Sequence, residues 1–200
     1  MRRLWLASAS PRRASLLASI GVPAQRLPAP DIDETPRPGE SAPDYVQRMA
    51  REKARVGWAR VPDPASAAVL GADTSVVLDN RILGKPRDPD EARAMLAALA
   101  GREHQVLSAV TVITVAGEQT ALSVSRVSMA PLDSADIQAY VATGEPMDKA
   151  GGYAIQGFAA VFVEQLSGSY SGVVGLPLAE TGQLLRQAGV LIWQQGETLA

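Results

Sequence analysis

One acidic residue, Asp73, falls inside a stretch of sequence that has the pattern of buried strand. Residues 67–78 hold two apolar runs rich in β-branched side chains, and residues 71–74 lie between them as an expected turn. Asp73 is therefore expected inside, or at the end of, a strand in the core. A carboxylate there is costly unless it is paired, hydrogen-bonded or bound to a metal. This segment alone leaves two alternatives open, a structural acid bonded to a backbone amide and a functional acid.

A second chemical signal is a pair of arginines at the expected start of a helix. Residues 4–7 have the pattern of a short strand, and residues 11–20 that of an amphipathic helix. Arg12 and Arg13 fall in the first helical turn, where cations oppose the helix dipole and anions are favoured. With Ser8 in the preceding turn, the segment is interpreted as a phosphate-binding site. The alternative is an ordinary helix start with solvated arginines.

Two lysines could bind the same anionic ligand, and one glutamate could bind a metal beside it. Lys53 falls on the apolar stripe of the helix expected over 41–61, so it either snorkels past the core edge or points into a cleft. Lys85 sits in a tight loop, where a lone lysine is ordinarily solvated. Glu34 belongs to an acidic loop over 28–41, and it becomes a candidate metal ligand only if it faces the cleft.

Composition narrows the chemistry further. The chain has 200 residues, 46% hydrophobic and 20% charged, which supports a sizeable core. Its 19 basic and 21 acidic residues give a net charge of −2, so no basic excess points to duplex nucleic acid. Cysteine is absent, which excludes disulfides and thiolate chemistry. The one histidine, His104, is interpreted as structural, so any metal must be bound by oxygen ligands, which favours Mg²⁺ or Mn²⁺.

The remaining segments alternate between strand and helix signals. We expect a helix over 89–100, a hairpin of strands over 105–115 and 120–129, a helix over 134–143, a strand over 158–166, a turn over 167–172 and a helix over 177–187. In the glycine-rich segment 145–157, Gln156 either reads a base edge, through its amide donor and acceptor, or belongs to a buried turn. The tail from Gly189 is expected to be frayed. No apolar run suits a signal peptide or a membrane span, so we expect a cytoplasmic protein.

Seven short motifs, taken together, resemble the Maf family. In chain order they are residues 8–13 (Ser-Ala-Ser-Pro-Arg-Arg), 33–35 (Asp-Glu-Thr), 52–54 (Glu-Lys-Ala), 71–74 (Gly-Ala-Asp-Thr), 84–86 (Gly-Lys-Pro), 148–157 (Asp-Lys-Ala-Gly-Gly-Tyr-Ala-Ile-Gln-Gly) and 174–178 (Val-Gly-Leu-Pro-Leu). Each motif alone is weak, but the ordered set is specific. The resemblance implies one α/β domain over residues 1–200, with a mixed twisted central sheet flanked by helices and two lobes around a substrate cleft, a Maf/ITPase-like fold.

The resemblance also implies an activity. Members are nucleoside triphosphate pyrophosphatases that release a monophosphate and pyrophosphate, use a divalent metal cation and commonly form homodimers. One branch acts on dTTP and UTP, and the positions that set its specificity are similar to Arg12, Thr74 and Gln156. The branch acting on 7-methyl-GTP typically has Trp in place of Arg12 and Gln in place of Thr74. The resemblance is therefore closer to the dTTP/UTP branch, with 7-methyl-GTP as the alternative substrate.

The residues then take hypothetical roles in a phosphoanhydride hydrolase. Asp73 is the expected general base, and Ser8, Arg13, Lys53 and Lys85 are expected to bind phosphates. Glu34 and Asp73 are expected to bind Mg²⁺ or Mn²⁺. A role in nucleotide house-cleaning follows from this hypothesis. The alternative, since the family name is tied to septum formation, is a non-catalytic nucleotide sensor linked to cell division; a nucleic-acid or membrane partner is not expected.

Overall fold

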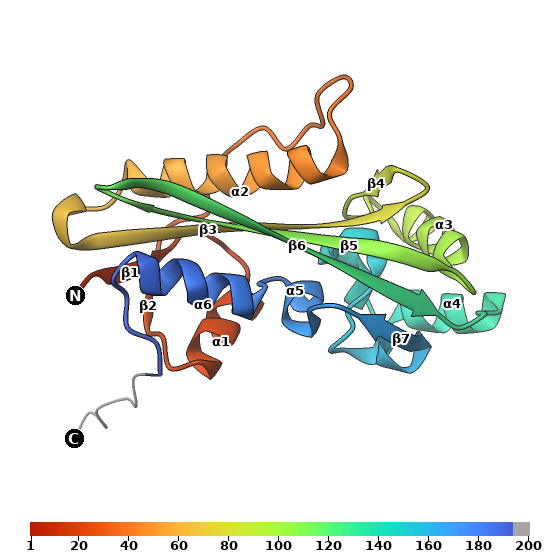
Figure 1. Ribbon diagram of the computed structural model, residues 1–200. Helices are drawn as coiled ribbons and strands as arrows, with labels where there is room; N and C mark the ends of the chain where they lie inside the picture. Colours follow the sequence, from red (N-terminus) through yellow and green to blue (C-terminus); the bar gives the residue numbers. More distant parts are fainter. Residues whose placement is uncertain (194–200) are drawn as a thin grey trace.

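A single mixed sheet organises the computed structural model, which describes residues 1–193 (Figure 1). The strands are β1 (Arg3–Leu6), β2 (Ala24–Arg26), β3 (Ala67–Leu78), β4 (Arg81–Leu83), β5 (Glu103–Thr114), β6 (Gly117–Met129) and β7 (Val163–Ser167). Their order across the sheet is β2-β1-β3-β5-β6-β7. The short strand β4 pairs in addition with the last residues of β3. Strand β1 pairs in parallel with β2 and β3, and the other pairings are antiparallel.

Helices lie on both faces of this sheet. They are α1 (Pro11–Ser19), α2 (Ala42–Trp58), α3 (Pro89–Leu99), α4 (Ser134–Ala142), α5 (Tyr170–Val174) and α6 (Leu178–Gln187), with short 3-10 turns η1 (Pro64–Ser66), η2 (Glu145–Asp148), η3 (Ala150–Gly152) and η4 (Phe158–Phe162). Helix α2 covers one face, while α1 and α6 lie against the other (Figure 1). The expected α/β fold is confirmed, with helices flanking a mixed central sheet.

Two apolar cores divide the face opposite α2 into two lobes. One core packs α1 and α6 against the first half of β3, through residues that include Leu17, Leu70 and Leu185. The other packs α3 and α4 against the last residues of β3, through residues that include Leu96 and Tyr140. Strand β3 therefore carries both lobes.

One edge of β3 is shared by two short strands. Strand β1 pairs with it up to Leu70, and β4 begins to pair at Val76. Among the described residues, no strand covers the edge of β3 between these two positions, whereas β5 pairs continuously along the other edge. The uncovered stretch, residues 71–75, contains Asp73.

The expected turn at residues 71–74 was wrong, because β3 runs unbroken through it. Gly71 serves a different purpose: a Cβ atom built there would lie 2.4 Å from the backbone nitrogen of Ala54 in α2. Since only glycine lets the two backbones approach so closely, α2 packs directly onto the strand. This contact sets the height of the α2 side chains, including Lys53, above Asp73.

The chain after α4 differs from expectation in two places. The strand expected over 158–166 begins as the 3-10 turn η4, and β7 starts only at Val163. The turn expected over 167–172 contains helix α5, which is capped by the Ser169 hydroxyl accepting from the Gly172 amide at 3.0 Å.

The two ends of the chain also depart from expectation. Strand β2, only three residues long, gave no recognisable sequence pattern. The expected fraying from Gly189 is wrong as far as Trp193, because Val190 is buried and the Trp193 amide donates to the Ile20 carbonyl at 2.8 Å. Residues 194–200 lie outside the described part. Within residues 1–193, no helix combines the length and the apolar character needed to cross a membrane.

Candidate active site

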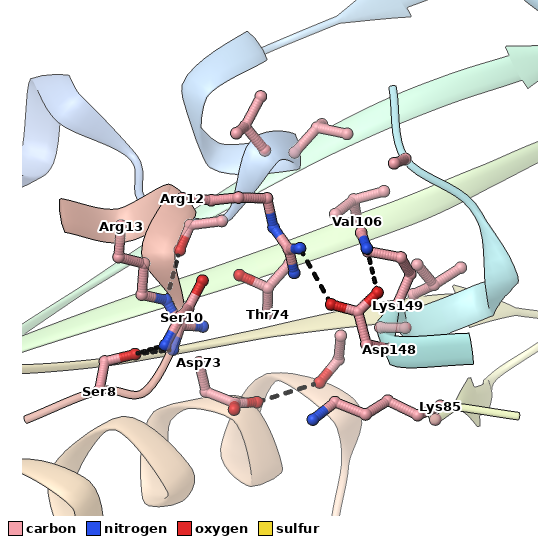
Figure 2. A pocket seen from close by; sticks show the side chains of 18 of the residues that line it. Ser8, Ser10, Arg12, Arg13, Asp73, Thr74, Lys85, Val106, Asp148 and Lys149 are labelled. Carbon is pink, nitrogen blue, oxygen red and sulfur yellow. Dashed lines mark hydrogen bonds and ion pairs between the residues drawn. The ribbon is translucent and has the colours of Figure 1, made fainter. Parts of the chain in front are cut away.

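A cleft of about 560 Å³ opens at the uncovered edge of β3. Figure 2 shows side chains from both lobes pointing into it. The nine site residues predicted from the sequence all line it: Ser8, Arg12, Arg13, Glu34, Lys53, Asp73, Thr74, Lys85 and Gln156. Ser8 and the arginines come from the β1–α1 turn and helix start, and Lys85 and Gln156 come from the other lobe. Asp73 and Thr74 form the floor between them.

A lysine and two carboxylates form the centre of the cleft. Lys53 Nζ lies 2.7 Å from Asp73 Oδ1 and 2.7 Å from Glu34 Oε1. The side chains of Lys53 and Asp73 are 11% and 13% exposed, so their attraction is only weakly screened by water. Lys53 therefore points into the cleft from the apolar stripe of α2, and the snorkelling alternative is excluded.

Electrostatics hold Glu34 in its charged form. Burial acts to raise the pKa of Glu34, but the hydrogen bond and charge of Lys53, with Lys85 and Arg13, lower it overall. The Tyr45 hydroxyl donates to the Glu34 carbonyl at 2.8 Å and so fixes the acidic loop against α2. Burial, together with the charges of Asp73 and Glu34, raises the pKa of Tyr45 to about 12. Tyr45 was not predicted as a site residue; its position on the α2 stripe resembles that of a core residue.

The β1–α1 turn and the first turn of α1 form the basic end of the cleft. Arg13 Nη1 donates to Ser8 Oγ at 3.1 Å, and Arg13 Nε donates to the Gly175 carbonyl at 2.8 Å. The Ser8 hydroxyl also accepts from the Ser10 amide at 3.1 Å. Burial lowers the pKa of Arg13, although Asp73 acts in the opposite direction; a guanidinium nevertheless stays charged in proteins. A fixed, half-buried cation thus lies on one side of Asp73.

An ion pair spans the cleft between the lobes. Arg12 Nη1, from the start of α1, lies 3.3 Å from Asp148 Oδ2 in η2, and Lys149 pairs with the other oxygen of Asp148 (Figure 2). Burial acts to raise the pKa of Asp148, and the two cations lower it overall. Asp148 and Lys149 were not predicted as site residues. In the sequence they were recognised only as the first two residues of the 148–157 motif, and neither was given a role.

The remaining predicted residues face the same space from different walls. Thr74 Oγ1 lies 2.9 Å from Ser108 Oγ, whose hydroxyl donates to the Gly172 carbonyl at 2.6 Å. Lys85 extends its ammonium group into the cleft in front of Asp73 (Figure 2).

His104 is buried away from the cleft. Its Nε2 atom lies 2.7 Å from the Tyr153 hydroxyl, and burial lowers its pKa to about 4. It therefore stays neutral at physiological pH, in agreement with the structural interpretation.

The carboxylates of Glu34 and Asp73 suit a metal ion that binds together with a phosphate ligand. Within residues 1–193, no three His, Cys, Asp or Glu side chains gather as a complete metal site. Glu34 and Asp73 nevertheless converge on one cationic atom, Lys53 Nζ. Mg²⁺ is commonly bound by one or two carboxylates, with phosphate oxygens and water completing its shell. The donor set fits this arrangement, so the cleft can bind a polyphosphate, polarise it and supply a base to an attacking water.

Known proteins are similar in sequence to this chain over almost its whole length. A family model described as "Maf-like protein" matches residues 3–188. Proteins named dTTP/UTP pyrophosphatase are similar to it: that of Alcanivorax borkumensis is 58% identical over 96% of this chain and 98% of its own. That of Shewanella oneidensis is 53% identical, covering 94% and 99%. That of Nitrosospira multiformis is 51% identical, covering 96% and 97%.

Proposed function

The chain belongs to the Maf family, and from this premise we propose that it hydrolyses dTTP and UTP to the nucleoside monophosphate and pyrophosphate. The observation that carries the proposal is the placement of Asp73, a carboxylate on the cleft floor beside Lys53, Arg13 and Lys85. Cations in such a cleft attract a polyphosphate, and a nearby carboxylate can activate water. The names of its relatives supply the nucleobase class.

We assign phosphate binding to four residues from four segments. These are Ser8 on the β1–α1 turn, Arg13 in the first turn of α1, Lys53 on α2 and Lys85 on the loop after β4. A nucleoside triphosphate carries about four negative charges near neutral pH, so charge-assisted hydrogen bonds from these groups supply both affinity and orientation. Arg13 is locked by Ser8 and Gly175 before the substrate arrives. This preorganisation reduces the entropy lost when the phosphates bind.

We assign the role of proton acceptor to Asp73. Its Oδ1 atom is bonded to Lys53 at 2.7 Å, while its Oδ2 atom has a contact at 3.5 Å with the Ser75 hydroxyl. Oδ2 is therefore the atom that takes the proton of the water attacking the α-phosphorus. A divalent cation, Mg²⁺ or Mn²⁺, held by Glu34 and Asp73, would neutralise phosphate charge and stabilise the leaving pyrophosphate. Lys53 keeps the two carboxylates together.

Base selection falls to Arg12, Thr74 and Gln156. A uracil or thymine edge presents an N–H donor between two carbonyl acceptors, and the Gln156 amide can both accept and donate. Arg12 donates to a carbonyl, and Thr74 reaches the floor of the cleft. Arg12 and Thr74 occupy the positions at which a 7-methyl-GTP enzyme would differ. We therefore place 7-methyl-GTP behind the two pyrimidine nucleotides.

A pyrophosphate-release screen tests the proposal. Purified protein is assayed with Mg²⁺ and separately with Mn²⁺, over dTTP, UTP, CTP, GTP, 7-methyl-GTP and ITP. We expect activity concentrated on dTTP and UTP. Activity on 7-methyl-GTP alone would overturn the assigned specificity. Binding without turnover of any substrate would instead support the alternative, a nucleotide sensor linked to cell division.

The assembly and location are proposed from the family premise as well. We infer one catalytic domain over residues 1–200, working as a cytoplasmic homodimer with a nucleotide as its ligand. Phe158 and Val161 of η4, 68% and 80% exposed beside edge strand β7, offer apolar surface to a second subunit. Light scattering on the eluted protein tests this: a mass near twice 21.0 kDa is expected. A monomeric mass across the micromolar range would contradict it.

A further inference from the structure

Gln156 is carried by a four-residue turn rather than by a helix or strand. The Gly157 amide donates to the Ala154 carbonyl at 2.9 Å, which closes a β-turn with Gln156 at its third position. Ala154 and Ile155 are buried, whereas Gln156 is exposed at the cleft. A turn of this kind takes its position from whatever holds its two ends.

The carboxylate of Glu145 holds the far end of the turn. Its Oε1 atom accepts from the Phe158 amide at 3.1 Å, and its Oε2 atom accepts from the Ala159 amide at 3.4 Å. Both amides belong to the first residues of η4, directly after Gly157. A Cβ atom built on Gly157 would lie 1.9 Å from Oε1, so the carboxylate lies directly against the turn backbone.

Tyr140 connects the same carboxylate to the near end. Its hydroxyl donates to Glu145 Oε2 at 2.8 Å and accepts from the Ala154 amide at 3.3 Å. Tyr140 is 3% exposed at the end of α4, so these bonds form away from water. Burial, reinforced by the carboxylate of Glu145, raises the pKa of Tyr140, and the hydroxyl stays protonated as the donor. One acid and one phenol thus hold both ends of the Gln156 turn.

We propose that Glu145 is a positioning residue that sets nucleobase discrimination by holding the turn that carries Gln156. The inference rests on the proposed function, because it gives Gln156 the base-reading role. Only an acceptor with two oxygens suits the three donors from Tyr140, Phe158 and Ala159. A glutamine in this place would set its own N–H group against one of these donors and leave that donor unpaired.

A double-mutant cycle tests the coupling. The ratio of kcat/KM for UTP to that for CTP is measured in wild type, Glu145→Gln, Gln156→Ala and the double variant. We expect Glu145→Gln to lower the ratio about tenfold, in keeping with the loss of one charged hydrogen bond. In the Gln156→Ala background the same change should alter the ratio less than about twofold. An unchanged ratio in the single variant, or an equal loss in both backgrounds, overturns the proposal.

Controls separate positioning from folding. Glu164→Gln, the same substitution at an exposed site on β7, should leave the ratio unchanged. If Glu145→Gln fails to fold, Tyr140→Phe removes only the hydroxyl and should lower the ratio about threefold; a folded Tyr140→Phe protein with the wild-type ratio overturns the proposal.

Failure of the coupling between Glu145 and Gln156 can be distinguished from failure of the proposed enzymatic function. A wild-type protein inactive on every nucleotide refutes the enzyme but not the coupling. The same cycle is then run on the dissociation constants of UMP and CMP. Non-additive effects of the two substitutions on the UMP-to-CMP ratio support the coupling, and additive effects overturn it.

Discussion

Lys53 Nζ lies 2.7 Å from Asp73 Oδ1, so one oxygen of the carboxylate is committed to the lysine and the other is left for the substrate side of the cleft. The same nitrogen lies 2.7 Å from Glu34. The lysine therefore keeps two carboxylates together at the centre of the cleft. It also fixes the direction in which Asp73, the proposed general base, faces.

Asp73→Asn should abolish most turnover without unfolding the protein. The amide keeps the size of the side chain but cannot accept a proton from water, and Lys53 retains Glu34 as a partner. We expect kcat to fall at least about 100-fold, with nucleotide binding within a few-fold of wild type. Steady-state kinetics and calorimetric binding measure the two quantities. Asp79→Asn, on the exposed turn after the same strand, is the matched control and should keep full activity. Near-normal turnover in Asp73→Asn would remove this residue from its role.

Lys85→Gln should weaken binding of the triphosphate more than it slows the chemical step. The ammonium group reaches into the cleft from a loop and supplies one charge-assisted contact, so we expect KM for UTP to rise about tenfold. Raising the ionic strength should weaken substrate binding less in the variant than in wild type. Arg87→Gln, two residues along the chain at a side chain 83% exposed and paired with Glu91, serves as the control. Equal KM values for wild type and Lys85→Gln would contradict the assignment.

Metal removal should stop turnover without loosening the free protein. Within residues 1–193 the carboxylates do not form a complete metal site by themselves, so the cation is expected to bind together with the nucleotide. EDTA should therefore abolish pyrophosphate release and leave the melting temperature of the nucleotide-free protein unchanged. Mg²⁺ with a product nucleotide should raise that temperature, and Mg²⁺ alone should not. A large loss of melting temperature in EDTA without nucleotide would show a resident structural metal instead.

His104 makes the fold less stable in acid. Burial lowers its pKa to about 4, below the value near 6.5 that an unfolded histidine has. The unfolded chain thus takes up a proton first, so this contribution is intact above about pH 6.5 and is lost as the pH falls toward 4. We expect the free energy of unfolding to drop by about 2 kcal/mol from pH 7 to pH 5 through this residue.

Urea titrations at the two pH values measure this effect. His104→Gln should lack the histidine contribution, because its amide does not titrate, while it can still bond to the Tyr153 hydroxyl. The difference between wild type and variant isolates His104 from the carboxylates that titrate at lower pH. The same pH dependence in both proteins would refute this account.

Sequence reasoning predicted which residues meet in the cleft better than it predicted the path of the backbone. Ser8, Asp73 and Gln156 each lie in an ordered motif, so the family resemblance placed them in one cleft that the structure also forms. The gap in the β3 edge depends on the registers of β1 and β4, which no local pattern encodes. Gly71 suggested a turn because composition does not distinguish a turn glycine from one that admits a helix backbone.

Contacts between residues far apart in the chain could not be predicted from sequence patterns either. Asp148 meets Arg12 from 136 positions away in the chain, and Glu145 acts on amides that have no side-chain signature. Hydrophobic periodicity reports only which face of an element is buried. Which charged residues meet across a cleft follows from the tertiary fold, so the contacts of Asp148 and Glu145 emerge only from the structure.

The unbroken strand β3 has a mechanical consequence. It pairs with β5 without interruption from Val69 to Val77, directly under the cleft. Rotating one lobe against the other would strain this continuous ladder, so we expect the floor of the cleft to resist bending. We therefore expect the width of the groove to be fixed before any nucleotide arrives. A purine base is larger than a pyrimidine base. We expect the fixed width of the groove to exclude it, because the lobes would not open to accommodate it.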